Sequence, residues 1–554
     1  MGTSTITGPA PDDPRQGADV RIACIAGSRA PRTRTIIRPR QHLAARWFSL
    51  SVARLFECSW SYPLDRLNTF NMFDLTKITM KRVLAAALLA SGAVVRAECP
   101  DYTEYAQSPH GDPSEGALGL PYMRPDPACR TFNSSAVEKV ISDMKQLIKD
   151  PDLARLFENT FPNANTTVRY FNATENFAQW LRDTANQFAH YAPLLSIDKD
   201  LATLVKGVIN NEARYVAEYP YCGAFQPPPE SGLEPSHNEW ADGVTVNPDR
   251  ELIKVQYELD SLVGFIKLSR SYYNATKDAS IINDNWKAAI DQIFRVMDEQ
   301  SQSTFDDDWN YISYYNWTGG GGALSPQVFN DGNGEPKKYT GMVSFLTPAN
   351  AMLSVELVHL ADLLDDAGQL ANVSESALKW SSQIYDAIYN YTIIDDVFAY
   401  ETNGFGGRFV MDDANVPSLL SLPYLGFIDK ADPAYVKTKD VLLSRLNPYY
   451  AEGQNFSGVG GPHVNPYAPW PMSQVSAIYG TDDDSEILTR LHTIMNTTDG
   501  LGLIHESISV YNVSDWTRPW FAWANSYFAE MVLDLAQRKP GLILVNDTSY
   551  TPGQ

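Results

Sequence analysis

Residues 348–365 read PANAMLSVELVHLADLLD, and a stretch of this kind decides the fold class. Its apolar side chains recur at three- and four-residue spacing, which is the pattern of an amphipathic helix. The same pattern predicts helices near residues 135–149, 178–191, 198–218, 252–273, 282–300, 374–391, 432–446, 484–496 and 520–538. Strand-like runs are few and short, so the chain is predicted to be mostly α-helical.

The loops between these helices are long and rich in glycine, proline and aromatic residues. No linker, charge run or low-complexity segment divides residues 98–554, so one large domain is the simplest organisation. Helices joined by such loops favour an α/α toroid, in which paired helices surround a central pocket. The loops at one end would then build the site.

The composition is that of a globular protein. The chain has 554 residues, of which 44% are apolar and 12% aromatic. Its formal net charge of −22 argues against a nucleic-acid partner, because phosphate binding needs a basic surface. Residues 1–79 differ from the rest, with eleven Lys/Arg against six Asp/Glu, which leaves −27 for residues 80–554. Neutral or cationic partners therefore fit best.

A secretory signal pattern follows this basic stretch. A start of the type Met-Lys-Arg precedes an apolar run too short to span a bilayer, and small residues at Val95 and Ala97 suit cleavage. We predict a signal peptide over residues 80–97 and no membrane span after its removal. Residues 1–79 are then an extension of the gene model; a transit peptide or a disordered tail is the alternative.

Two features favour an extracellular or secretory-lumen location with N-glycosylation. Asn-x-Ser/Thr acceptors occur at Asn133, Asn165, Asn172, Asn274, Asn316, Asn372, Asn390, Asn455, Asn496, Asn512 and Asn546, against roughly four or five by chance. The predicted mature part has three cysteines, of which Cys99 and Cys129 could close a loop as a disulfide and Cys222 would be a buried thiol. No Cys/His spacing resembles a zinc site, so no metal is predicted.

Two loops combine charged and aromatic residues in a way that suits a sugar. Arg182 and Asp183 follow Trp180, so they could hydrogen-bond vicinal hydroxyls while the indole stacks on a pyranose. The alternative is a buried ion pair at a helix terminus. Glu258 and Asp260 stand before an apolar run, and each could be either a sugar contact or a helix N-cap.

Two further loops carry polar groups. Asp412, Asp413 and Asn415 precede an apolar helix, and capping explains one of the two acids but not both. His463 and Trp470 lie in a loop pair rich in glycine and proline, which is either a pocket wall or merely an ordered loop.

The densest group of such residues lies between positions 505 and 523. It consists of His505, Glu506, Arg518, Trp520 and Trp523. An acid beside a histidine, an arginine and several indoles indicates a carbohydrate subsite. The alternative is a stacked aromatic core with a solvated glutamate.

These motifs resemble glycoside hydrolase family 125, the exo-α-1,6-mannosidases, and in particular its fungal-type members. The resemblance covers about residues 99–540 and rests on WLRD at 180–183, YELDSL at 257–262, MDDANVPSL at 411–419, GGPH at 460–463, HES at 505–507 and TRPWFAWAN at 517–525. It implies an all-α (α/α)6 barrel, hydrolysis with inversion at the non-reducing end of mannose-containing glycans, and no cofactor.

The resemblance also assigns one catalytic role. The family's general base is the Glu of its His-Glu-Ser motif, which is Glu506 here. Inversion needs a second carboxyl group as general acid, roughly 6.5–9.5 Å from the base. The family carries that acid in an Arg-Pro-Ser-Asp-Asp-Ala motif between Thr-Gly-Met and Pro-Ala-Asn. This chain has both flanks, but Val343 is followed directly by Ser344 and the acid motif is absent.

Two explanations of this gap stay open: a mis-drawn exon boundary, or a paralogue that has lost its acid. An active exo-α-mannosidase, a catalytically impaired mannose-binding relative, and a hydrolase or lyase acting on another sugar are accordingly the three candidate functions. Asp260 is the single residue considered as a replacement acid.

Overall fold

The fold is described from a computed structural model of the chain. It covers residues 99–162, 179–231, 252–254, 258–302, 306, 308, 310, 345–403, 406–462 and 464–553. Residues 97–554 form one compact unit. The predictions for residues 1–79 and for a signal peptide at 80–97 fall outside the described residues.

Helices make up most of this unit. They are α2 (Tyr102–Tyr105), α3 (Ser135–Leu147), α4 (Pro151–Thr160), α6 (Leu181–Ala189), α7 (Lys199–Glu218), α8 (Leu259–Thr276), α9 (Asp284–Gln300), α10 (Thr347–Ala367), α11 (Ala371–Tyr391), α12 (Leu422–Leu425), α13 (Pro433–Leu442), α14 (Pro471–Tyr479), α15 (Asp484–Met495), α16 (Ala522–Arg538) and α17 (Pro540–Ile543).

The strands are two or three residues long and pair antiparallel in small sheets. They are β1 (Gln179–Trp180), β2 (Ala224–Phe225), β3 (Leu252–Lys254), β4 (Phe345–Leu346), β5 (Ile393–Ile394), β6 (Val397–Phe398), β7 (Glu401–Thr402), β8 (Arg408–Phe409), β9 (Tyr450–Glu452) and β10 (Ser457–Val459). The sheet orders are β1-β2-β3, β4-β7-β8, β5-β6 and β10-β9.

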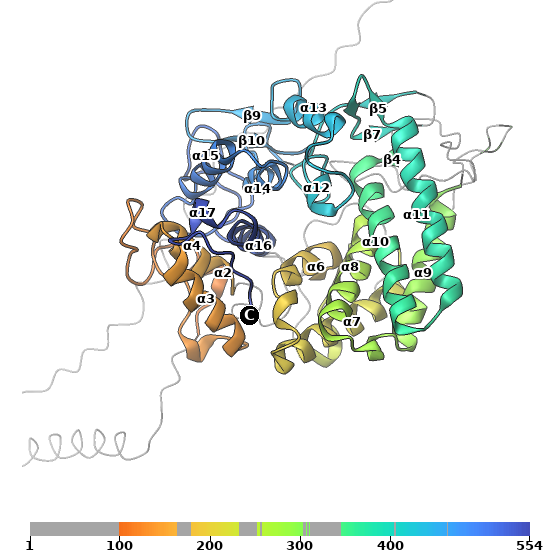
Figure 1. Cartoon of the computed structure of the whole chain (residues 1–554), viewed down its shortest axis with the longest axis horizontal. Coiled ribbons are helices and arrows are strands. Elements are labelled where there is room, and N and C mark those ends of the chain that lie inside the picture. Colours follow the sequence, from red (N-terminus) through yellow and green to blue (C-terminus); the bar gives the residue numbers. More distant parts are fainter. Residues whose placement is uncertain are drawn as a thin grey trace, which may run out of the picture. The chain divides into compact units, whose positions relative to one another are not determined.

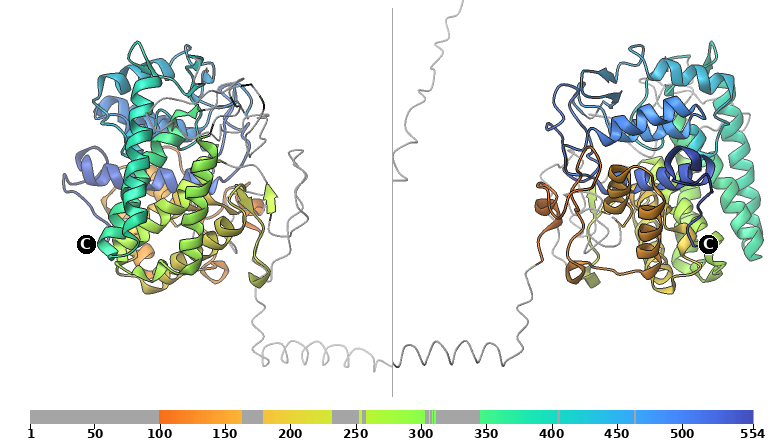
Figure 2. Two further views of the ribbon diagram at one scale, coloured as in Figure 1. Left: turned by 90° about the vertical axis from the view of Figure 1, so that its right-hand side faces the viewer. Right: turned by 60° about the vertical axis from the view of Figure 1, so that its left-hand side comes forward.

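Six helices form an inner ring (Figure 1). In the order α6, α8, α10, α12, α14 and α16, each contacts the next, and α16 closes the ring on α6. Other helices pack outside them: α7 against α8, α11 against α10, α15 against α14 and α4 against α16. Helix α11 comes to the front in the left view of Figure 2, which places it on the outer layer. This arrangement confirms the predicted (α/α)6 barrel.

The apolar core lies between the two layers. Phe265 of α8 and Trp286 of α9 are fully buried, with ring centroids 6.3 Å apart. The indole nitrogen of Trp286 donates a hydrogen bond to Ser269 Oγ at 3.1 Å, so the buried polar atom is satisfied. No helix among the described residues is long and apolar enough to cross a bilayer.

Two predictions about local structure were wrong. The helix expected over residues 252–273 begins only at Leu259, because residues 252–254 instead pair with β2 as strand β3. The segment around Trp470 and Pro471, expected to be a loop, starts helix α14. Proline at the first helical position is compatible with a helix, since its missing N–H has no partner there in any case.

Candidate active site

The inner helices begin at one end of the ring. Arg182, in the first turn of α6, contacts Glu258 and Asp260 at the start of α8. Its guanidinium also lies 5.1 Å from the ring centroid of Trp523, in the first turn of α16. Residues preceding or opening three helices, far apart in the sequence, therefore meet in one cluster.

The same end includes the start of α14. Trp470, which precedes α14, packs edge-to-face on Phe521, which precedes α16, with ring centroids 5.6 Å apart. Phe521 in turn lies 6.0 Å from Trp523. The predicted indoles Trp470 and Trp523 thus join one aromatic group, and both are buried.

The six inner helices lack side-chain N-caps in the described part of the chain. By contrast, α3, α4, α7, α9, α13 and α15, which lie outside the ring, each begin with a side chain that accepts from the first turn. The first N–H groups of a helix carry its positive dipole end. The site end of the ring therefore gathers the positive dipole ends of the inner helices, which favours acidic side chains there.

Arg182 stands at the centre of an acidic cluster. Its Nη1 lies 3.0 Å from Glu258 Oε2 and 3.0 Å from Asp260 Oδ2, while Nη2 lies 3.3 Å from Asp183 Oδ2. All four side chains are buried. Burial alone would lower the pKa of Arg182, but the three acids outweigh it and hold that pKa well above its usual value.

For the acids Asp183 and Asp260 the balance of causes is reversed, because burial outweighs the charge of Arg182. Burial raises the pKa of Asp183 to about 6, and the charge of Arg182 opposes that rise. Burial likewise raises the pKa of Asp260 to about 6, again against Arg182. One guanidinium therefore does not fully offset the burial of Asp183 and Asp260, so these two groups take up protons at a higher pH than exposed aspartates do.

Glu506 lies at a more open edge of the site. Its Oε1 is 2.9 Å from Arg518 Nη1, and its Oε2 accepts a hydrogen bond of 2.8 Å from Thr517 Oγ1. The Glu506 side chain is 14% exposed and that of Arg518 is 20% exposed. Both carboxylate oxygens are oriented, and solvent still reaches the group.

Arg518 connects the two groups of acids. Its charge lowers the pKa of Asp183, although burial is the larger influence on that group and raises it. Asp183 and Glu506 are therefore both within the electrostatic range of Arg518. Arg518 therefore links Asp183 and Glu506, which are far apart in the sequence.

Asp412 and Asp413 differ in their surroundings. Asp412 Oδ1 and Oδ2 accept hydrogen bonds from the backbone N–H groups of Leu419 and Leu420, at 2.8 and 3.0 Å, just before α12. These contacts favour the capping role for Asp412. Asp413 Oδ1 instead accepts from both the backbone and the side chain of Asn415, at 2.9 Å each.

Tyr400 is a site residue that the sequence did not reveal. Its hydroxyl is buried, has no hydrogen-bond partner among the described residues, and carries a pKa raised well above its usual value. Burial is the main cause, and the charges of Asp413, Asp412 and Asp260 add to it. Tyr400 thus lies near Asp260 at the start of α8 and near Asp412 and Asp413 in the loop before α12. Its backbone carbonyl accepts from Thr347, which opens α10.

The other predicted residues surround this centre. The buried ring of His505 stacks on Trp516 with centroids 4.9 Å apart, and His505 Nδ1 lies 3.0 Å from the Arg518 carbonyl oxygen. Trp520 is half-buried and packs edge-to-face on Tyr102 at 4.8 Å. Trp180, also half-buried, precedes α6.

Two predictions concern residues outside the described part of the chain. His463 and the junction between Val343 and Ser344 lie outside the described residues. Within the described ranges, no group of His, Cys, Asp and Glu side chains could hold a metal ion. A disulfide joins Cys99 to Cys129, and Cys222 is a buried free thiol.

Comparison with known proteins supplies the family. The sequence model of the metal-independent α-mannosidases (GH125) matches residues 150–533. A meiotically up-regulated gene 157 protein of Schizosaccharomyces pombe is 42% identical over 487 residues, which span 81% of this chain and 94% of the relative. The chain belongs to glycoside hydrolase family 125.

A solved family 125 structure has the same fold. A metal-independent α-mannosidase of Streptococcus pneumoniae, in a non-productive complex with α-1,6-mannobiose, superposes with a TM-score of 0.62. Its sequence is 24% identical, and the match covers 73% of this chain and 99% of that one. The match shows that this chain and the solved enzyme share the helical fold.

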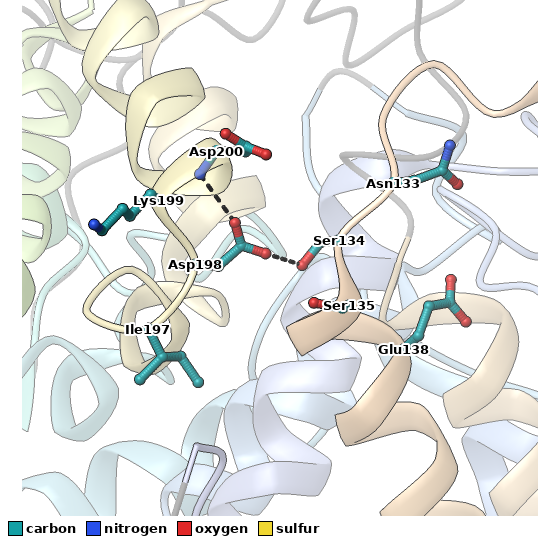
Figure 3. A pocket seen from close by; sticks show the side chains of 8 residues that line it. All are labelled: Asn133, Ser134, Ser135, Glu138, Ile197, Asp198, Lys199 and Asp200. Carbon is teal, nitrogen blue, oxygen red and sulfur yellow. Dashed lines mark hydrogen bonds between the residues drawn. The ribbon is translucent and has the colours of Figure 1, made fainter.

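A polar cleft elsewhere does not belong to this site. It lies where α3 and α7 begin, and Figure 3 shows that Asp198 accepts from Ser134 and from the backbone of Asp200. Helix α7 follows α6 in the chain, so its start lies at the far end of the α6–α7 hairpin from Arg182. The cleft is formed by two neighbouring helix caps.

Proposed function

We propose that the protein is an exo-α-1,6-mannosidase that hydrolyses its substrate with inversion. The observation that carries this proposal is the pairing of Glu506 with Arg518 and Thr517 beside the buried Arg182 cluster. A carboxylate that is oriented on both oxygens and open to solvent suits activation of water. The ligand of the Streptococcus pneumoniae enzyme, α-1,6-mannobiose, supports the linkage.

The buried cluster suits recognition of a terminal mannose. Asp183, Glu258 and Asp260 offer acceptors and Arg182 offers donors, which matches a ring carrying several hydroxyl groups. Trp523 contributes an apolar face beside them. A terminal sugar held by such a buried group would leave the rest of the glycan outside, as exo-action requires.

The experiment is a linkage and anomer assay. The full chain, carrying a family-type Asp-containing block between Val343 and Ser344, is incubated with α-1,6-, α-1,3- and α-1,2-mannobiose, and the first mannose anomer released is followed by proton NMR. We expect release from the α-1,6 isomer and initial formation of β-mannose. Initial release of α-mannose would contradict inversion, and preference for another isomer would contradict the linkage.

A second candidate is a mannose-binding relative with impaired catalysis. The observation that favours it is the direct connection of Val343 to Ser344, which leaves out the general-acid motif expected from the resemblance. Asp260 is a poor replacement, because it is fully buried and paired with Arg182 at 3.0 Å. Binding of α-1,6-mannobiose without release of mannose would support this candidate. The transcript across codons 343 and 344 decides whether the gap is real.

We also infer a secretory location with N-glycosylation. The acceptor asparagines within the described residues are all exposed: Asn133, Asn274, Asn372, Asn390, Asn455, Asn496, Asn512 and Asn546. The Cys99–Cys129 disulfide fits an oxidising compartment. Treatment of the native protein with an endoglycosidase should lower its apparent mass. An unchanged mass would contradict the inference.

A further inference from the structure

Two loop segments beside Glu506 are joined by backbone hydrogen bonds in antiparallel order. The backbone N–H of Ile508 donates to the Pro469 carbonyl at 3.0 Å, and that of Val510 donates to the Tyr467 carbonyl at 2.9 Å. The pairing joins the loop before α14 to the loop that carries the base. Val510 is four residues along the chain from Glu506, and its backbone N–H contacts Tyr467 across the pairing.

Two exposed tyrosines lie at the outer end of these segments. Tyr511 is 74% exposed and Tyr467 is 41% exposed. Their ring centroids are 6.1 Å apart, with an angle of 43° between the rings. Single exposed aromatic side chains are common, but a pair in contact is an amphipathic surface suited to stacking.

The location of the pair gives it a role. If the terminal mannose occupies the Arg182 cluster, the rest of an oligosaccharide leaves past the partly exposed side chains of Glu506 and Arg518. Tyr467 and Tyr511 lie beyond Glu506 on the same two segments.

We propose that Tyr467 and Tyr511 form a distal subsite that stacks on a neutral hexopyranose of the substrate, on the reducing-end side of the scissile bond. The proposal rests on the proposed function. Tyrosine suits the role because its ring covers the apolar face of a sugar while its hydroxyl stays in solvent. Such a subsite would make the protein favour oligosaccharides over a disaccharide.

A glycan attached to the protein is a second sugar that the two tyrosines could bind. Asn512 is an exposed glycosylation acceptor next to Tyr511, and the side chain of Asn455, another acceptor, donates to the Tyr511 carbonyl at 3.1 Å. A glycan attached to the protein could cover the tyrosine pair. The experiment therefore needs an arm that separates substrate from attached glycan.

The test is calorimetric titration of the full chain with S-linked α-1,6-mannobiose and S-linked α-1,6-mannotetraose, which are not hydrolysed. We expect the tetrasaccharide to bind about tenfold more tightly than the disaccharide, which corresponds to about 1.4 kcal/mol. The double variant Tyr467→Ala/Tyr511→Ala should lose this difference and keep its affinity for the disaccharide. Tyr467→Phe/Tyr511→Phe should retain it.

Tyr385 provides the matched control. It is 42% exposed and contacts Tyr389 and Phe427 on the outer layer, so Tyr385→Ala should leave both affinities unchanged. The titrations are repeated with Asn512→Gln and with enzymatically deglycosylated protein, and the preference should persist in both.

Three outcomes would overturn the proposal. Equal affinity of the unmodified protein for both sugars would exclude the subsite but would not affect the proposed function. A preference that appears only after removal of the glycans would assign the tyrosines to an attached glycan. Failure to bind either sugar would exclude the proposed function, and with it the subsite.

Discussion

Arg518 and Glu506 form an ion pair at the open edge of the site, with 2.9 Å between Nη1 and Oε1. Thr517 holds the other carboxylate oxygen. Each carboxylate oxygen has two lone-pair sites, so both oxygens can be oriented while one still accepts a hydrogen bond from water. This relationship makes Glu506 the described acid best suited to act as a base.

The first prediction concerns Glu506 itself. Glu506→Gln keeps the size of the side chain and removes its basicity, so kcat should fall at least ~10²-fold with little change in KM. The substrate is α-mannosyl fluoride, whose leaving group needs no proton. Glu486→Gln, which alters an ion pair with Arg490 on α15, is the control and should leave kcat unchanged. Near-normal turnover by Glu506→Gln would show that Glu506 is not the catalytic base.

The second prediction concerns the missing acid. Insertion of a family-type Asp-containing block between Val343 and Ser344 should give or restore hydrolysis of α-1,6-mannobiose, because the leaving alkoxide can then be protonated. The same block with both aspartates changed to asparagine should not. The chain without an insert should hydrolyse the fluoride and leave the disaccharide nearly intact. Equal activity of that chain on both substrates would show that another residue supplies the proton.

The third prediction concerns Arg182. Arg182→Met leaves three buried acids without their cation and should lower the free energy of unfolding at pH 8 by ~3–5 kcal/mol. The loss should be smaller at pH 5, because Asp183 and Asp260, whose pKa values are already about 6, can then take up protons. Urea unfolding at both pH values measures it. Arg295→Met, which breaks a more exposed ion pair with Glu299, is the control. If Arg182→Met lowered the free energy of unfolding equally at both pH values, the proposed charge compensation of the acids by Arg182 would be wrong.

The fourth prediction concerns Glu401 on β7. Burial raises its pKa from 4.5 to about 7, so the folded state prefers the protonated form. That stabilisation is complete below pH 4.5 and is lost as the pH rises through 7. Glu401→Gln should therefore match the unmodified protein below pH 4.5 and exceed its stability at pH 8 by ~3 kcal/mol. Thermal unfolding measures this, with exposed Glu452→Gln as the control. An identical pH dependence in both variants would contradict it.

Helical periodicity predicted most of the long helices and favoured an α/α toroid, although α8 begins at Leu259 and not at residue 252, and the (α/α)6 barrel was implied by the family resemblance. It missed α4 and α14, which begin with prolines, and the four-residue α12, which is too short to show a period. Sequence motifs also brought Arg182, Glu258 and Asp260 into one predicted site.

Other parts of the site depend on tertiary contacts that leave no local pattern. Tyr400 is one aromatic residue outside any motif, and it reaches the acids only because β7 pairs with β4. The sequence also could not tell which of two adjacent acids caps a turn. The backbone bonds from Leu419 and Leu420 distinguish Asp412 from Asp413.

The separate placement of the site segments, each before a different inner helix, has a genetic consequence. A splice change between Val343 and Ser344 touches one connection, while the ring is closed by contacts among helices that such a change does not reach. The connection before α10 can therefore change its chemistry while the helix contacts that hold the other site residues stay in place.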